Sequence, residues 1–196
     1  MMPRAGLSPT AVVDVAVAVV DEGGPRALTL AAVATRAEVA TPSLYKHVKN
    51  LDELVDLVGV RVLDELTERV TRSVVGFGGP AAVGALLRAY RDYAVEHPHR
   101  YAMLPQSPRE TPGRETAGRR LMDTIFAVLA GCGVTGADAV HLTRCIRAAG
   151  HGFATLESQG GFQLAEDIET SFATLTRMVL SALPPVNPKP RRVPPG

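Results

Sequence analysis

LTLAAVATRAEVATPSLYKHVKNLDEL, residues 28–54, contains three helix-start signals in close succession. Thr29 is a favoured N-cap residue. Thr41-Pro42 places proline where the first turn of a helix tolerates it, and Asn50-Leu51-Asp52-Glu53 resembles a capping box. The segment therefore predicts a short helix after Thr29, a second from Thr41 to about Val48, and a long one from Asn50.

An earlier helix completes a small unit. Ser8-Pro9 predicts its start and Gly23-Gly24 its end. Apolar residues recur at helical spacing in this helix and in the two short ones, which predicts one shared core. The inward positions are Val12, Ala16, Val19, Val20, Leu30, Val33, Ala34, Ala37, Leu44 and Val48.

Two short helices joined by about four residues, behind a closing helix, follow the plan of a helix-turn-helix unit. The outer side of the segment from Thr41 carries groups that suit DNA. Hydroxyl and basic side chains can bond bases or phosphates, and proline can contact a thymine methyl. The predicted DNA contacts are Thr29, Thr41, Pro42, Ser43, Tyr45, Lys46, His47 and Lys49. Tyr45 and His47 could instead pack this helix against the next one.

The segment resembles the N-terminal domain of TetR-type transcriptional regulators. The Leu-Tyr-x-His core, Leu44-Tyr45-Lys46-His47, stands after a small turn and just before a long helix, and the likeness covers about residues 8–58. The resemblance implies that the eight residues above face DNA. Glu38 departs from the pattern, because the family often has a turn glycine there, so we expect a strained or slightly altered turn.

Composition sets the remaining limits. The chain has 196 residues, a net charge of +1 and 46% hydrophobic residues. This net charge is too small to indicate a nucleic-acid partner by itself. Any such prediction must therefore rest on where individual basic residues stand along the chain. Cys132 and Cys145 are too few for a disulfide framework, and no signal or membrane-spanning segment is apparent. We expect a cytoplasmic protein without membrane partner, cofactor or metal, and hydrolase and phosphate-loop motifs are absent, so no enzyme is predicted.

Helical spacing continues to the end of the chain and predicts an all-α fold. Helices are expected over about 50–75, 81–96, 99–104, 114–131, 136–158 and 166–183, with a Pro-rich loop at 105–112. The predicted division is a helix-turn-helix domain at 1–50, a connecting helix at 51–78, a ligand-binding and dimerisation domain at 79–183, and a disordered Pro-rich tail at 184–196.

The family resemblance implies that the C-terminal helices bind a small-molecule effector and form a homodimer. A cavity is predicted among Met103, Leu104, Met122, Phe126, His141, Arg144 and His151, although Arg144 and Arg147 also suit solvated or ion-paired roles. The predicted dimer residues are Phe153, Ile168, Phe172, Leu175, Val179 and Leu183. Spacing alone fits an intramolecular core stripe equally well.

The stretch from His151 to Glu157, followed by Gly160-Gly161-Phe162, resembles a C-terminal subtype marked by a Trp-His-Gly triplet. Gly150 stands where that tryptophan would be, and the subtype says little about the ligand.

These features together predict a dimeric repressor that binds a palindromic operator, with two recognition helices about 34 Å apart, and that a small molecule releases. The alternative is a metal-responsive or ligand-binding helical protein without operator recognition. Its basis is that His141 and Cys145 stand four residues apart, a spacing that can bind a transition metal.

Overall fold

The computed structural model describes residues 7–104 and 111–185, and every regular element in these two ranges is helical. The N-terminal part contains α1 (Pro9–Gly23), the 3₁₀ helix η1 (Pro25–Ala27), α2 (Leu30–Arg36) and the 3₁₀ helix η2 (Thr41–Lys46). The remainder contains α3 (Leu51–Val74), α4 (Pro80–Glu96), α5 (Pro98–Tyr101), α6 (Pro112–Gly131), α7 (Gly136–Ser158) and α8 (Ile168–Ser181). The predicted all-α fold is confirmed.

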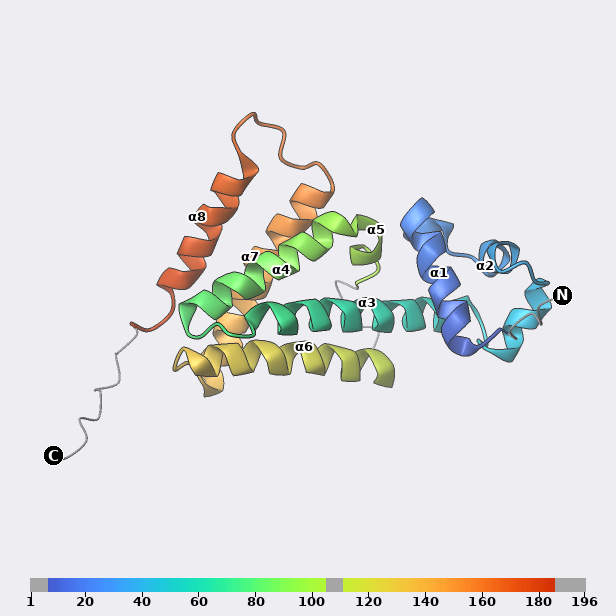
Figure 1. The fold of residues 1–196 in the computed structure, drawn as a ribbon, viewed down its shortest axis with the longest axis horizontal. Helices are drawn as coiled ribbons and strands as arrows, with labels where there is room; N and C mark the ends of the chain where they lie inside the picture. Colours follow the sequence, from blue (N-terminus) through green and yellow to red (C-terminus); the bar gives the residue numbers. More distant parts are fainter. Residues whose placement is uncertain (1–6, 105–110, 186–196) are drawn as a thin grey trace.

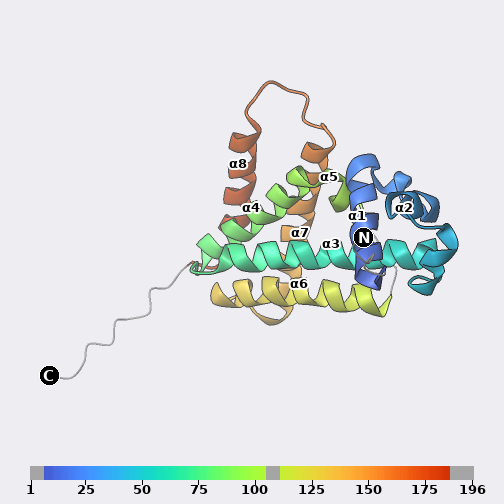
Figure 2. The ribbon, with the colours of Figure 1, turned by 45° about the vertical axis from the view of Figure 1, so that its right-hand side comes forward.

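Helix α3 connects the two parts of the molecule. Its 24 residues span about 36 Å at about 1.5 Å per residue. The N-terminal helices gather at one end of it, α6 runs along one side, α4 lies on the other, and α7 passes behind it from the α6 side to the α4 side (Figures 1 and 2). Helix α8 packs against α4 and α7 at the end remote from the N-terminal helices (Figure 1). One continuous helix therefore reaches from the helix-turn-helix unit into the C-terminal bundle.

The helix-start signals operate as the sequence predicted. Ser8 Oγ accepts from the backbone N–H of Ala11 at 3.1 Å, and Thr29 Oγ1 accepts from that of Ala32 at 3.1 Å. At the third start, Asn50 Oδ1 accepts from Glu53 N–H at 2.9 Å. The Glu53 carboxylate in turn accepts from the backbone N–H of Lys49 at 2.5 Å, one residue earlier than in the standard capping box.

The predicted third helix differs in type and length. Residues Thr41–Lys46 form a 3₁₀ helix, because Ser43 N–H bonds to Ala40 O and His47 N–H bonds to Leu44 O, each at 2.8 Å across three residues. Leu44 and Val48 are nevertheless buried in the small core, as their spacing predicted. The helix expected at 99–104 also ends early, at Tyr101.

Glu38 has a left-handed backbone conformation, with φ of 55°, unlike any other non-glycine residue that the structure describes. The turn is closed by Val39 N–H bonding to Ala34 O at 3.0 Å and Glu38 N–H bonding to Thr35 O at 3.1 Å. The left-handed turn that the family builds with glycine is thus kept here, at a cost of about 1–2 kcal/mol for a side-chain-bearing residue.

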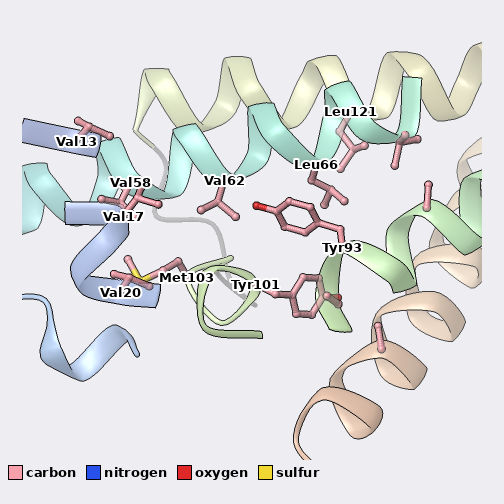
Figure 3. Close-up of a cluster of buried hydrophobic side chains, with 14 of the residues drawn as sticks. Val13, Val17, Val20, Val58, Val62, Leu66, Tyr93, Tyr101, Met103 and Leu121 are labelled. Atoms are coloured by element: carbon pink, nitrogen blue, oxygen red, sulfur yellow. The ribbon is translucent and has the colours of Figure 1, made fainter. Parts of the chain in front are cut away.

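An aliphatic seam joins the N-terminal helices to the rest of the chain (Figure 3). Val17 and Val20 of α1 pack beside Val58 and Val62 of α3, and Met103 lies next to Val20. All five side chains are buried. The two parts therefore share one hydrophobic core.

Two predicted segments fall largely outside the described residues, the Pro-rich loop at 105–112 and the tail from residue 184. Within the described ranges, no single helix is long and apolar enough to cross a membrane. Helices α6 and α7 pass that test only as a pair, and they are bent by 115° at their junction.

Candidate functional site

The outer face of η2 presents the residues that the sequence assigned to DNA. Leu44 and Val48 anchor the segment inward with 0% and 2% exposure, while Tyr45 is 56% exposed. Pro42, Lys46 and Lys49 are also exposed. The partly exposed positions are Thr41, Ser43 and His47.

Several of these groups are free to bond outward. The Lys49 side chain is 87% exposed and its Nζ lies 3.8 Å from Glu53 Oε1, a loose pair that a phosphate could replace. The Thr29 hydroxyl accepts from Ala32 N–H and can still donate its proton. The exposure of Tyr45 argues against a role in packing alone. All eight predicted DNA contacts keep some exposed surface.

Charged contacts tie this unit to the C-terminal helices. Arg100 of α5 donates from Nε and Nη2 to the two carboxylate oxygens of Asp21, each at 2.7 Å, and from Nη1 to Glu65 Oε2 of α3 at 3.0 Å. Tyr93 of α4 donates its hydroxyl to the same Glu65 oxygen at 2.9 Å. Helices α1, α3, α4 and α5 are therefore joined by one polar network.

A cavity of about 630 Å³ opens between α3, α4, α6 and α7, within the usual size range of ligand sites. Its walls are mainly aliphatic, with five polar or charged side chains. The lining consists of Leu63, Leu66, Leu86, Leu87, Tyr90, Leu104, Arg114, Glu115, Gly118, Leu121, Met122, Ile125, Ile146, Arg147 and His151. A second hollow of about 680 Å³ between α3 and α4 is more open and lined largely by charged residues. The first is therefore the better ligand site.

The cavity includes only part of the predicted ligand set. Leu104, Met122 and His151 line it. The other four do not line it: Met103 is buried in the seam beside α1, Phe126 is half-buried elsewhere on α6, and His141 and Arg144 are exposed on α7. Sequence spacing could have identified Arg147, which precedes His151 by one helical turn.

The polar end of the cavity is a chain of three side chains. The Tyr101 hydroxyl lies 2.5 Å from Nδ1 of His151 and 3.1 Å from the Tyr90 hydroxyl. Burial, assisted by the nearby Arg147 cation, lowers the pKa of His151. Burial raises the pKa of both tyrosines. At neutral pH this end therefore holds three uncharged hydrogen-bonding groups beside one guanidinium.

Arg114 links the cavity wall to α3. Its guanidinium is buried, donates from Nη2 to the Val55 carbonyl at 3.0 Å, and places Nε 3.0 Å from Asp56 Oδ1. The second contact is an ion pair without hydrogen-bond alignment. Gly59 makes room for this group, because a Cβ there would lie 2.6 Å from Arg114 Nη2.

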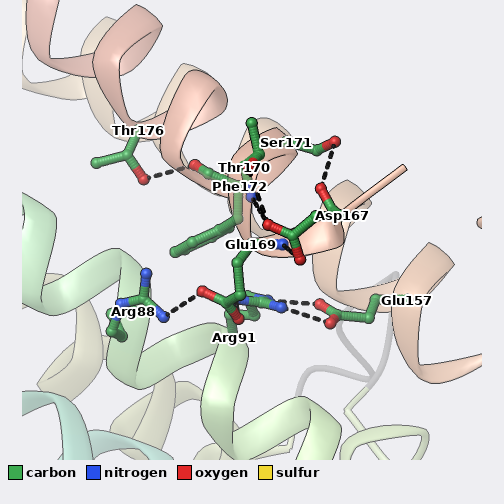
Figure 4. Close-up of polar contacts among 9 residues, drawn as sticks. All are labelled: Arg88, Arg91, Glu157, Asp167, Glu169, Thr170, Ser171, Phe172 and Thr176. Atoms are coloured by element: carbon green, nitrogen blue, oxygen red, sulfur yellow. Dashed lines mark hydrogen bonds and ion pairs between the residues drawn. The ribbon is translucent and has the colours of Figure 1, made fainter. Parts of the chain in front are cut away.

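An arginine cluster holds α8 in place (Figure 4). Arg91 donates from Nε and Nη2 to the Glu157 carboxylate and from Nη1 to Glu169, all at 2.5 Å. Arg88 also donates to Glu169, at 3.0 Å. Both guanidinium groups lie over the Phe172 ring, with its centroid 4.6 Å from Arg91 Cζ and 5.0 Å from Arg88 Cζ.

The predicted dimer residues differ in how deeply they are buried within the single chain. Phe172 and Leu183 are 1% and 9% exposed within the single chain, so they belong to its core. Leu175 and Val179 are half-buried against the same core, Phe153 packs on Phe162 and Phe172, and Ile168 is half-buried at the start of α8. For Phe172 and Leu183, the structure supports the alternative that the stripe packs within the chain's own core.

A different surface is left open on α7 and α8. Cys145 and Ala148 are exposed, and a Cβ at Gly152 would meet nothing within 4 Å. Leu156 and Met178 are exposed apolar side chains, at 50% and 65%. His141 and Cys145 lie exposed on the same helix. In the described ranges, no group of three or more His, Cys, Asp or Glu side chains is placed to bind a metal.

Comparisons with known proteins agree with this geometry. Residues 12–58 match the family described as bacterial regulatory proteins of the tetR family, and residues 83–179 match the family described as tetracyclin repressor-like, C-terminal domain. The chain is 32% identical over 186 residues to the uncharacterized HTH-type transcriptional regulator YobS of Bacillus subtilis (strain 168), covering 93% of this chain and 96% of that one. It is 35% identical over 178 residues to the uncharacterized HTH-type transcriptional regulator Rv0681 of Mycobacterium tuberculosis, covering 90% and 80%.

Solved structures share the fold. A protein of unknown function from Rhodococcus sp. RHA1 superposes with a TM-score of 0.79 at 22% identity, covering 93% of this chain and 99% of that one. A TetR variant from Acinetobacter baumannii AYE in complex with minocycline gives a TM-score of 0.67 at 20% identity, covering 89% and 95%. With both domains matched and full-length relatives above 30% identity, the chain belongs to the TetR family of helix-turn-helix transcriptional regulators.

Proposed function

We propose that this regulator is a homodimeric repressor that binds a palindromic operator and is released by a small molecule. The observation that carries the proposal is the continuity of α3, which begins next to η2 and supplies Leu63 and Leu66 to the cavity wall. A ligand that displaces the cavity end of α3 would move the recognition segment. The division into residues 1–50, 51–78 and 79–183 describes these three roles.

The outer face of η2 is the proposed recognition surface. Lys46 can reach a guanine edge, and Thr41 and Ser43 can bond bases or phosphates. Tyr45 and Lys49 are both exposed, and their side chains suit contacts with the phosphate backbone of the DNA. With a net charge of +1, binding depends on these local contacts more than on the field of the whole protein.

Two routes connect the cavity to that surface. Arg114 lies in the cavity wall and bonds α3 at Val55 and Asp56, close to its N-terminal end. Tyr101 touches His151 at the polar end of the cavity, while its neighbour Arg100 bonds Asp21 of α1. A ligand acts through these contacts only if it binds the two conformations with different affinity.

The homodimer is proposed to form through the outer face of α7 and the adjoining side of α8. Small residues at Cys145, Ala148 and Gly152 would let two helices approach closely, and Leu156 and Met178 would be covered in the process. Two-fold pairing of the chain would present two η2 segments to successive major grooves. The match of residues 83–179 to a family described as tetracyclin repressor-like supports repression of transcription over activation.

A mobility shift on the gene's own flanking DNA tests the proposal. Lys46→Ala is expected to weaken binding on the order of tenfold, since one good base contact contributes about 1–3 kcal/mol. Arg72→Ala is the matched control, because Arg72 is an exposed cation at the far end of α3. Equal losses in both variants, or no loss in either, would contradict the assignment of η2.

A further inference from the structure

We propose that the effector is an amphipathic anion, with one carboxylate-like head group and an apolar body, held with its head at Arg147. This inference rests on the proposed function, since it names the chemical class that the cavity takes. Three observations carry it: the nature of the walls, the charge balance of the lining and the hydrogen-bonding groups at one end.

The walls suit an apolar body. Most lining side chains are leucine, isoleucine or methionine, and the cavity volume is about 630 Å³. Burying apolar ligand surface there contributes about 25 cal/mol per Å² before the costs of association. Such walls offer no hydrogen bonds, so any polar group of the ligand must be placed at the polar end.

The charge balance leaves one cation without a partner. Arg114 is paired with Asp56 at 3.0 Å. Glu115 is paired with Arg119 at 2.6 Å. Arg147 has no hydrogen bond or ion pair to any residue in the described ranges, yet it lies close enough to His151 to lower that group's pKa. Arg147 is exposed, so the lining carries a positive charge that solvent meets and that no side chain of the described ranges pairs with.

The hydrogen bonds beside Arg147 determine which groups could meet a carboxylate. Nδ1 of His151 is occupied by the Tyr101 hydroxyl at 2.5 Å, so Nε2 is the ring nitrogen left for a ligand. The Tyr101 hydroxyl donates its one proton to the Tyr90 hydroxyl at 3.1 Å, so Nδ1 of the neutral His151 ring carries the ring proton and donates to Tyr101. Nε2 is then an acceptor, and a carboxylate would accept from the guanidinium fork of Arg147 alone. Arg147 would repel an ammonium head.

Calorimetric titration of the full chain tests the inference, with ligands that share one apolar body and differ only in the head group. The probes are octanoate and 4-phenylbutanoate, each beside the alcohol and the amine with the same body. Both carboxylates are expected to bind on the order of tenfold tighter than the alcohols, because a hydrogen bond to a charged group contributes about 1.5–3 kcal/mol. The amines are expected to bind most weakly.

Variants on one helix separate this site from general surface charge. Arg147→Gln should remove the preference for carboxylate over alcohol while leaving alcohol affinity unchanged, and Arg147→Lys should restore part of it. Arg144→Gln is the matched control, since Arg144 is exposed on α7, as Arg147 is, but does not line the cavity. It should change neither affinity.

Each outcome decides the inference. Equal affinity for acid and alcohol, an effect of Arg144→Gln as large as that of Arg147→Gln, or no binding by either carboxylate would overturn it. The mobility shift without ligand tests the proposed function separately. Failure to bind flanking DNA, together with carboxylate preference at Arg147, would reject the proposed function and retain the anion site.

Discussion

Gly59→Ala is expected to destabilise the protein although it removes a glycine from the middle of a helix. Alanine normally improves a helix interior by about 1 kcal/mol over glycine. Here the new Cβ would lie 2.6 Å from Nη2 and 2.7 Å from Cζ of Arg114. The guanidinium would have to shift, which strains or breaks its bond to Val55 O and its pairing with Asp56, both at 3.0 Å.

The expected size follows from these opposing effects. Removing the partner of a buried ion pair costs about 3–5 kcal/mol, and the gain in helix propensity offsets about 1 kcal/mol of it. The net loss in the free energy of unfolding should therefore be at most about 2–4 kcal/mol, reached if the pair is broken altogether. Gly84→Ala is the control, because the nearest atom to a Cβ there, on Thr176, lies at 3.9 Å, and we expect no loss.

The assay is urea unfolding followed by circular dichroism at one fixed protein concentration, since the proposed dimerisation would make stability concentration-dependent. An Arg114→Ala background supplies the decisive comparison, because Gly59→Ala should be neutral or stabilising once the guanidinium is absent. A Gly59→Ala protein as stable as the wild type, or an equal loss in the Arg114→Ala background, would refute the proposed clash.

Three further predictions concern the Arg100–Asp21 ion pair between α5 and α1, the proposed dimer surface, and the dependence of stability on pH. Arg100→Gln should cost about 1–2 kcal/mol of unfolding free energy, since it removes a partly buried bidentate pair; a double-mutant cycle with Asp21→Asn checks this, and strictly additive losses would contradict it. Gly152→Arg should leave a folded monomer, because a Cβ there meets open space; light scattering that still reports a dimer would exclude this face. The pKa of His151 is lowered in the fold, so the unfolded state binds more protons below about pH 6.5 and stability should fall there. Urea midpoints of His151→Gln should show less of this loss, and identical pH profiles would contradict the assignment.

The sequence predicted the helix-turn-helix unit well because its signals are local. Caps at Ser8, Thr29 and Asn50 act within three residues, and the burial of Leu44 and Val48 follows from spacing along one segment. The 3₁₀ character of η2 was not foreseen, since proline at the first turn is compatible with either helix type.

The C-terminal site was less predictable because it depends on how separate helices face one another. Spacing identified a stripe at Phe172 and Leu183 but could not decide between the chain's own core and a second subunit. Residue type suggested His141 for the cavity, yet its place on α7 turns it to solvent. Arg114 could not be assigned from sequence, because Asp56 and Gly59 lie far from it along the chain.

The exposed face of η2 is proposed to read operator DNA in two copies. Hydroxyl-radical footprinting of the gene's flanking DNA by the full chain can detect both copies at once. We expect two protected patches in successive major grooves, about 34 Å apart on one face of the duplex, and their joint loss with Lys46→Ala. An absence of protection, a single patch, or two patches that persist unchanged in Lys46→Ala would contradict it.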